Sequence, residues 1–347
     1  MDSLDFSQAD RDRASRYHRP LYAATVVRLL VVAGVAAVFT VVPLHAGAPV
    51  WALAVTAAAG VATAPLDLWR SLVRERRFGL STQTARGWLA DRAKGEAVEL
   101  ALAAAVWTAA VALGRALPRW WPVPAAAGLA LLVLVLAFVA PVVLEPLFNR
   151  FRPLADERLA AELRALAVRA GVPVRDVLVA DASRRTTRTN AYVSGLGPTR
   201  RVVLWDTLLA DASQPELRLV VAHELGHRRA RHVLKGTVLG MAGAVGLVAL
   251  LWAALGAPRP DDFPRAMLLF LGYGLAAAPV LSWISRRWER EADRASLELT
   301  GDRDAFVRAH LDLARKNLSD LTPPRLAYLF LFSHPTAPER IAGARSR

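Results

Sequence analysis

The chain has 347 residues, 54% of them hydrophobic, no cysteine and a formal net charge of +14. The absence of cysteine excludes disulfide bonds and thiolate metal ligands, so any metal must be held by histidine and carboxylate side chains. No recognised nucleic-acid motif accompanies the charge, so we expect no nucleic-acid partner, and basic loops that meet anionic lipid explain it better. A mean hydropathy of +0.29 is too high for an ordinary soluble enzyme and indicates membrane spans.

Long apolar segments recur along the chain, and each approaches or exceeds the ~20 residues that cross a bilayer. The candidate spans are residues 24–44, 50–69, 97–114, 123–144, 234–256 and 266–285. The third is rich in alanine and contains Glu99, and Arg28 near the start of the first can reach the membrane interface. A buried core helix would explain any one of these segments, but six in one chain predict a polytopic transmembrane protein in a lipid bilayer.

Basic residues around the first two spans predict the orientation. Arginines are frequent in the N-terminal tail and in residues 70–94, whereas the turn at residues 45–49 has no Lys or Arg. The positive-inside rule places both basic segments in the cytoplasm. Residues 149–233 and 286–347 then fall on the same side, so we expect a multi-pass inner-membrane protein with both of these segments in the cytoplasm. A cleaved signal peptide is the alternative for the first span, but its polar tail of about twenty residues is long for such a segment.

Residues 150–233 lack the apolar runs of the spans. Residues 155–170 predict an amphipathic helix that ends at Gly171 and Pro173. Short strands are predicted at residues 176–180, 190–197 and 201–206, the second of them running into a glycine turn. Residues 213–216 (Ser-Gln-Pro-Glu) have the sequence of a capping box that opens a further helix. The sequence therefore predicts a small α+β unit between spans.

The helix after this capping box carries His-Glu-Leu-Gly-His at residues 223–227. At about 100° per residue, His223 and His227 lie roughly 40° apart on one face, where two imidazoles can hold one Zn²⁺. Glu224 lies on the flank, where its carboxylate can take a proton from a metal-bound water. The bare pattern also occurs by chance in surface helices. Here an apolar run, residues 219–222, precedes it, and bare imidazoles in that setting are costly without a metal.

Two histidines and a water leave a tetrahedral zinc one protein ligand short. His232 is nearest in sequence, but on a straight helix it lies roughly 180° from His223, so we expect a solvated or lipid-interface histidine. The extended pattern H-E-x-x-H-x-x-G-x-x-H also fails, because Ala230 and Val233 occupy its Gly and last His positions. The third ligand is therefore expected elsewhere in the chain.

A better source is the segment after the last predicted span, residues 285–293. Glu289 and Asp293 are four residues apart and share a helix face, so one carboxylate can bind zinc while the other orients a ligand histidine. A solvated, salt-bridged helix end is the alternative explanation of this segment. Spacing alone does not choose between Glu289 and Glu291 as the ligand.

Several separated motifs together resemble the integral-membrane zinc metallopeptidases related to the type I CAAX prenyl endopeptidase. The resemblance covers most of the chain, from about residue 70 to the C-terminus. Its motifs are residues 77–84 (RFGLSTQT), 145–151 (EPLFNRF), 189–192 (TNAY), 223–227 (HELGH), 285–293 (SRRWEREAD) and 333–335 (SHP). The resemblance implies that Glu289 is the third zinc ligand and that Asp293 is its partner that orients a zinc-bound histidine. It also implies a helical barrel in the membrane around a large chamber.

The resemblance assigns further site residues. It implies that Asn190, Ala191 and Tyr192 line the substrate cleft, where an extended peptide adds to a strand edge by main-chain hydrogen bonds. Without it, these residues would be a plain strand with a turn-forming Asn. His334 would stand near the zinc and help to hold substrate or the developing oxyanion. A capping or core histidine before Pro335 is an equal alternative for His334.

The chain also departs from this family. Its eukaryotic members have about seven spans, and about six are counted here, so we expect an N-terminal helix to be missing. The composition, rich in Ala, Val and Arg, is typical of a GC-rich bacterial genome, which identifies the chain as a bacterial member. Most bacteria lack protein prenylation, so we expect the substrate to be a peptide or a damaged or misassembled membrane protein rather than a prenylated CAAX protein.

We therefore expect a mainly α fold, a polytopic transmembrane helical bundle or barrel with an inserted small α+β zinc-peptidase unit. Its expected parts are an N-terminal membrane region with about four spans (residues 1–148), a cytoplasmic α+β unit with the zinc-binding helix (149–233), two spans (234–285) and a helical part that completes the zinc site (286–347). The expected activity is endopeptidase hydrolysis with one Zn²⁺ per chain.

Two other functions stay open at this point. An HtpX-type heat-shock protease shares the zinc motifs, although the four spans before the catalytic unit and the Pro-Leu-Phe-Asn stretch argue against it. A non-catalytic membrane scaffold or transporter, in which the H-E-x-x-H pattern is incidental, is the alternative of a different class. Metal content separates the scaffold from the enzymes, because a scaffold need not bind one zinc per chain.

Overall fold

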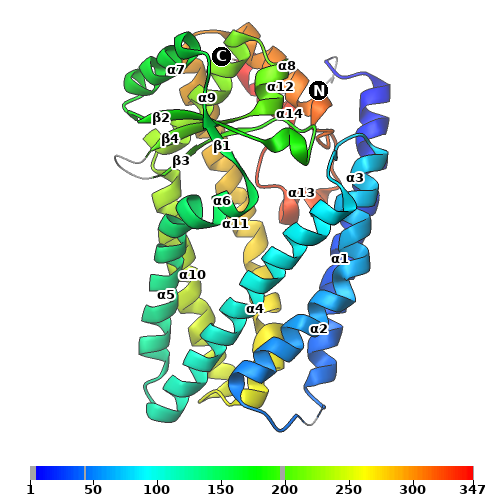
Figure 1. Ribbon diagram of the computed structural model, residues 1–347, viewed down its shortest axis with the longest axis vertical. Helices are drawn as coiled ribbons and strands as arrows, with labels where there is room; N and C mark the ends of the chain where they lie inside the picture. The colour runs from blue at the N-terminus through cyan, green and yellow to red at the C-terminus, as the bar shows by residue number, and fades with distance from the viewer. Residues whose placement is uncertain (1–4, 43, 196–199, 347) are drawn as a thin grey trace.

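A computed structural model of the chain describes residues 5–42, 44–195 and 200–346 (Figure 1). Long helices form one end of the molecule, and a small sheet with shorter helices forms the other (Figure 1). Within the described residues, six helices are long and apolar enough to cross a membrane: Gln8–Phe39, Ala48–Arg77, Ala85–Ala116, Pro122–Val139, His232–Leu255 and Pro260–Thr300. The predicted mainly α, polytopic fold with a small α+β unit is confirmed.

Each long helix begins before its predicted span. These helices are α1 (Gln8–Phe39), α2 (Ala48–Leu68), α4 (Ala85–Ala116), α5 (Pro122–Val139), α10 (His232–Leu255) and α11 (Phe263–Thr300). Helix α1 starts well before its apolar run because Ser7 and Asp10 form a capping box at its N-terminus. Helix α11 continues past the bundle without a break and ends at Gly301, whose φ of 66° is left-handed. Both helices therefore reach from the bundle to the sheet end (Figure 1).

Short segments link these helices and surround the sheet. Two π-helical segments, η1 (Trp69–Val73) and η2 (Ala140–Leu144), lead into the short helices α3 (Arg74–Arg77) and α6 (Glu145–Phe148). The remaining helices are η3 (Ala182–Arg184), α7 (Glu157–Arg169), α8 (Asp206–Asp211), α9 (Gln214–Arg229), η5 (Pro260–Asp262), α12 (Arg303–Lys316), α13 (Arg325–Leu331) and α14 (Ala337–Arg345). The predicted amphipathic helix is α7, and the predicted capping box opens α9, so both predictions are confirmed.

In the described part of the chain, the sheet has four strands in the order β1-β2-β4-β3. They are β1 (Phe151–Pro153), β2 (Asp176–Ala180), β3 (Ala191–Ser194) and β4 (Arg201–Trp205). Strands β2 and β4 pair in parallel, and β3 pairs antiparallel with β4 at the sheet edge. The three predicted strands are confirmed, although the glycine turn expected at residue 197 lies outside the described residues, and β1 was not predicted.

Helices α7 and α9 cover the sheet with an apolar core. Leu163 and Leu166 of α7, Leu204 of β4 and Val221 and Leu225 of α9 are at most 1% exposed and belong to one cluster. Burial of aliphatic side chains is the main favourable term in folding, so this core holds α9 in place. One face of α9 is therefore committed to the sheet, and the opposite face is left for α11.

Helices α9 and α11 approach each other closely at Gly226. A Cβ atom at Gly226 would lie 3.0 Å from the Ala295 Cβ and 3.2 Å from both the Cα and the carbonyl oxygen of Ala292. A side chain here would force its neighbours on α11, which are themselves alanines, to shift by a few tenths of an ångström. The contact brings the HELGH motif of α9 against the Glu289–Asp293 segment of α11.

The chain changes direction directly after α9. Arg231 has a φ of 58° and a ψ of 32°, which is left-handed and uncommon for a residue with a side chain. Helix α10 then begins at His232. The expected angle of roughly 180° between His223 and His232 assumed a straight helix through both residues. That assumption is wrong, because the helix ends before His232.

We predict that Gly226→Ala lowers the apparent melting temperature of the detergent-purified protein by several degrees. Alanine favours a helix by up to ~1 kcal/mol, but overpacking against the Ala292 backbone costs roughly 1–3 kcal/mol. Gly343→Ala in α14 is the control, because no atom lies within 4 Å of its would-be Cβ and it should be neutral or stabilising. Equal stability of both variants would contradict the close-packing argument.

Candidate metal centre

Three side chains from α9 and α11 converge on one point. His223 Nε2 and His227 Nε2 lie 3.1 Å apart, as expected for residues one helical turn apart on the same face. Glu289 Oε2 lies 3.3 Å from His223 Nε2, and Glu289 Oε1 lies 3.2 Å from His227 Nε2. These are the three residues that the sequence and the family resemblance put forward as metal ligands, and the structure brings them together.

The spacing of these atoms fits a tetrahedral metal site. Ligand atoms held about 2.0–2.1 Å from a tetrahedral zinc ion lie roughly 3.3 Å from one another. Glu289 is 5% exposed, and its Oε2 has no hydrogen-bond partner among the described residues. A buried carboxylate oxygen without a donor is costly, and a bound cation removes that cost. The nitrogen and oxygen donors present therefore fit a zinc ion.

Asp293 and Arg340 support the first histidine. Asp293 Oδ1 lies 3.0 Å from His223 Nδ1, and Arg340 Nε donates to Asp293 Oδ2 at 2.9 Å. Arg340 also lies 3.2 Å from His223 Nδ1 and 3.9 Å from Glu289 Oε2 through its Nη2. Burial lowers the pKa of His223, but the neighbouring carboxylates of Asp293 and Glu289 outweigh it and raise the pKa to about 9. The carboxylates thus favour positive charge at this imidazole.

Sequence reasoning missed Arg340, because it lies 117 residues from His223 and in no motif considered. The only local signal is the capping box of Thr336 and Glu339, which starts α14 and sets the position of Arg340 on its first turn. Asp293 makes the contact that a positioning role requires, and this role stays a prediction.

The second histidine, His227, contacts His232. The Nδ1 atoms of the two rings lie 3.0 Å apart, and His232 Nε2 lies 3.3 Å from Glu291 Oε2. His232 is 4% exposed, so the expected solvated or lipid-interface histidine is wrong. The left-handed turn at Arg231 explains the difference, because it returns the chain toward the metal face. Glu291 points to His232, which leaves Glu289 as the carboxylate that faces both metal histidines.

Glu224 lies in the wall of the cavity beside the metal ligands. Burial raises the pKa of its carboxyl, and the neighbouring His223 and His227 act in the opposite direction. A raised pKa strengthens the carboxylate as a proton acceptor. This position and this pKa suit the proton-transfer role that the sequence motif suggests.

His334 follows α13 and stands at the same cavity. Its Nε2 lies 3.3 Å from Glu289 Oε1, its Nδ1 lies 2.8 Å from Ser333 Oγ, and its side chain is 61% exposed. It is therefore not a core histidine, and Thr336 caps α14 in its place. Its contribution to the site stays a prediction.

The three residues of the expected substrate cleft face different ways. Asn190 lines the cavity, whereas Ala191 is 2% exposed and packs in the core of the sheet. The Tyr192 hydroxyl lies 3.3 Å from Glu145 Oε2, to which it donates. Alternation along β3 turns Ala191 to the face opposite that of Tyr192, since successive residues of a strand point to opposite faces. Strand β3 nevertheless is an edge strand beside the cavity, which main-chain addition of a peptide requires.

The cavity has a volume of about 690 Å³. His223, Glu224, Glu289 and His334 lie in its wall, as do Tyr17, His18 and Tyr22 of α1 and the segments 188–190 and 317–320. His310 also faces it, and burial, followed by the charge of Arg340, lowers the pKa of His310 to about 3. This histidine is therefore neutral at physiological pH, with Nδ1 bonded to the Phe306 carbonyl at 2.8 Å.

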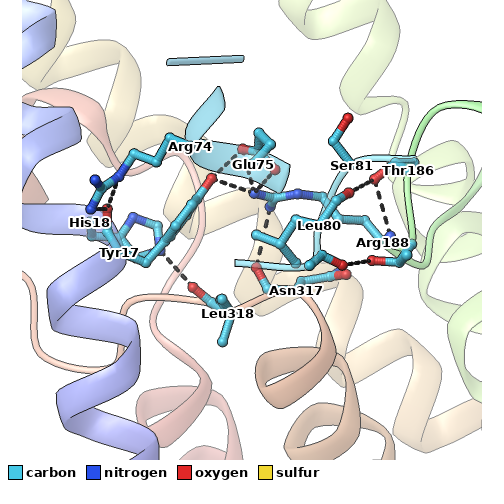
Figure 2. Close-up of polar contacts among 12 residues, drawn as sticks. Tyr17, His18, Arg74, Glu75, Leu80, Ser81, Thr186, Arg188, Asn317 and Leu318 are labelled. Carbon is cyan, nitrogen blue, oxygen red and sulfur yellow. Dashed lines mark hydrogen bonds and ion pairs between the residues drawn. The ribbon is translucent and has the colours of Figure 1, made fainter. Parts of the chain in front are cut away.

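A polar network fixes the part of the cavity wall that contains Tyr17, Arg188 and Asn317 (Figure 2). Arg188 donates to the Tyr17 hydroxyl at 2.7 Å, to Glu75 at 3.1 Å and to the Asn317 carbonyl at 3.2 Å. The Asn317 side chain bonds both the N–H and the carbonyl of Thr189, at 3.0 and 3.1 Å. Helix α1 and the end of α12 thus hold the backbone just before Asn190.

Comparisons with known proteins agree with this geometry. The model of peptidase family M48 matches residues 153–347, and a model described as CAAX prenyl protease N-terminal, five membrane helices, matches residues 22–150. The chain is 32% identical over 307 residues to the uncharacterized metalloprotease YhfN of Bacillus subtilis, covering 81% of this chain and 69% of that protein. It is 28% identical over 309 residues to CAAX prenyl protease 1 of Saccharomyces cerevisiae, covering 80% and 67%.

The fold is also similar to a solved structure. The crystal structure of S. mikatae Ste24p matches with a TM-score of 0.83 and 22% identity, covering 99% of this chain and 90% of that chain. At this identity the likeness shows the fold alone. The family model covers more than half of the chain, and the expected resemblance to membrane zinc metallopeptidases is confirmed. The chain belongs to peptidase family M48, and it is a multi-pass membrane metallopeptidase.

Proposed function

We propose that the protein is a zinc endopeptidase of the inner membrane that hydrolyses peptide bonds in peptide or membrane-protein substrates. The observation that carries the proposal is the convergence of His223, His227 and Glu289 within 3.1–3.3 Å of one another. Glu224 stands beside them in the wall of a cavity of about 690 Å³. A cavity of this size suits a ligand or a short extended peptide segment. The substrate therefore presents an unfolded stretch to the site.

In this proposal, His223, His227 and Glu289 hold the zinc ion, which when bound acidifies a water and polarises the scissile carbonyl. Glu224 accepts the proton of the attacking water and returns it to the leaving amine. Its raised pKa supports the first of these steps, acceptance of the proton. Asp293 and Arg340 keep the His223 ring in one orientation. His334 donates a hydrogen bond to the oxyanion in this proposal, which its exposed side chain beside Glu289 supports.

Substrate binding is proposed at Asn190 and the outer edge of β3, where Arg228 Nε donates to the Val193 carbonyl at 3.1 Å. An extended peptide can add to an edge strand by main-chain hydrogen bonds and run toward the metal ligands. Asn190 lies in the cavity wall, and the Arg188–Asn317 network holds the backbone before it. This rigidity supports the proposal, since a preformed strand edge loses little entropy on binding.

The proposed orientation places this site at the cytoplasmic side. The basic helix α3 (Arg74–Arg77) and the start of α1 lie at the same end of the molecule as the sheet (Figure 1). Positive-inside reasoning assigns that end to the cytoplasm. For the substrate, we propose processing or quality control of membrane proteins or peptides rather than cleavage of prenylated CAAX proteins. The match of the N-terminal membrane model to residues 22–150 weighs against the HtpX-type alternative.

We predict that Glu224→Gln keeps its zinc but loses roughly 10²- to 10⁴-fold in turnover, because the amide cannot accept the water proton. Cleavage of an unstructured peptide pool, followed by mass spectrometry, measures the loss. Glu298→Gln on the exposed face of α11 is the matched control and should cleave like the wild type. Cleavage by Glu224→Gln at a near wild-type rate would sink the mechanism.

We predict that elemental analysis finds about one zinc per purified wild-type chain and a large loss of zinc in Glu289→Ala. Glu291→Ala, which alters the neighbouring acid that faces His232, should retain its zinc in metal-replete buffer. Zinc retained by Glu289→Ala and lost by Glu291→Ala would identify Glu291 as the third ligand instead. A folded wild type without zinc would favour the non-catalytic scaffold.

A further inference from the structure

The His227 ring has a partner on each of its two nitrogens. Its Nε2 faces Glu289 and His223, and its Nδ1 lies 3.0 Å from His232 Nδ1. A neutral imidazole that binds a metal through one nitrogen carries its proton on the other. If Nε2 is the zinc-binding atom, as the proposed function requires, His227 must therefore donate an N–H from Nδ1.

His232 is placed to accept that hydrogen bond. Acceptance at Nδ1 requires the His232 proton to be on Nε2, and this atom lies 3.3 Å from Glu291 Oε2. The three residues then form a directional chain in which His227 donates to His232 and His232 donates to Glu291. Each ring nitrogen of His227 and His232 then has one role, as a donor, an acceptor or a metal ligand, and each ring N–H has an acceptor.

The local structure holds His232 in this place. The ring stacks on Trp288, with centroids 5.0 Å apart and planes inclined by 12°. The left-handed Arg231 directly before it is an uncommon conformation that costs of order 1–2 kcal/mol. Such a conformation persists where the surrounding structure requires it, and here it is what turns His232 toward His227.

The two zinc histidines are thereby supported in different ways. Asp293 contacts His223 directly, with Arg340 behind it. Glu291 is half exposed and reaches His227 only through the intervening His232. Alternate residues of α11 thus provide one ligand and both supporting carboxylates. We propose that His232, backed by Glu291, is a positioning residue that fixes the tautomer and ring orientation of His227 for zinc.

Two substitutions separate a hydrogen-bonding role from a packing role. His232→Phe keeps an aromatic ring on Trp288 but removes the acceptor, whereas His232→Asn supplies a side-chain oxygen near the Nδ1 position but removes the ring. Loss of an outer hydrogen bond to a metal histidine weakens metal affinity by roughly 10- to 100-fold. We expect the zinc dissociation constant to rise by that factor in His232→Phe and much less in His232→Asn.

The measurement is chelator competition for zinc with the detergent-purified full chain. The apparent melting temperature of the metal-free protein reports whether each variant folds. The reverse order of affinities would show a packing role and overturn the proposal. Unchanged affinity in His232→Phe, or equal losses in both variants, would overturn it as well.

Glu291 gives a second test on a half-exposed position, where misfolding is not expected. Glu291→Leu removes the acceptor for His232 Nε2 and should raise the zinc dissociation constant several-fold. Glu291→Gln keeps an oxygen acceptor and should stay within about twofold of wild type. Equal zinc affinities of the two variants would show that Glu291 does not support His227 through His232.

This inference rests on the proposed zinc site, and the outcomes distinguish the two. A wild type that binds no zinc would contradict both the proposed function and the positioning role of His232. If the wild type binds one zinc and Glu289→Ala loses it, the proposed function is supported. Unchanged zinc affinity in His232→Phe would then contradict the positioning role alone.

Discussion

The close packing of α9 on α11 at Gly226 is the contact on which the rest of the site depends. The separation of the two helices there sets the distance between the two histidines of α9 and the carboxylate of α11. The sheet and α7 pack against α9 through an aliphatic core, and α11 is one of the long helices of the bundle. The candidate metal site therefore lies at the interface between the helical bundle and the α+β unit, and its geometry depends on how these two parts pack together.

Burial of so many polar groups at this seam needs compensation, because an unpaired buried charge is costly. Glu289 and Asp293 are both buried, and Arg340 from α14 supplies the opposing charge. His223 and His227 each have a partner on the nitrogen that does not face the other ligands. In the described part of the chain, Glu289 Oε2 is the site atom left without a donor, and it is the atom that a metal ion would satisfy.

Long helices connect this centre to the bundle. The start of α1 reaches the cavity, where Tyr22 donates to Asp320 at 2.5 Å and the His18 ring contacts the Leu318 carbonyl at 2.6 Å. Arg188 and Asn317 tie the same region to the backbone that precedes Asn190 (Figure 2). This part of the cavity wall is thus built from segments about 300 residues apart in sequence. The proposed substrate site and the packing of helix α1 share these residues.

Much of this protein follows from the sequence by itself, because the relevant signals are local. Hydropathy predicted the spans, the capping box predicted the start of α9, and spacing put His223 and His227 on one face. The four-residue spacing of Glu289 and Asp293 was also local, but the choice of Glu289 over Glu291 depended on the rotation of α11 against α9. Arg340 and His232 were decided only by tertiary structure. Arg340 lies 117 residues from His223 in sequence, so no local pattern connects them. His232 faces His227 because of the left-handed Arg231, which hydrophobic periodicity does not predict.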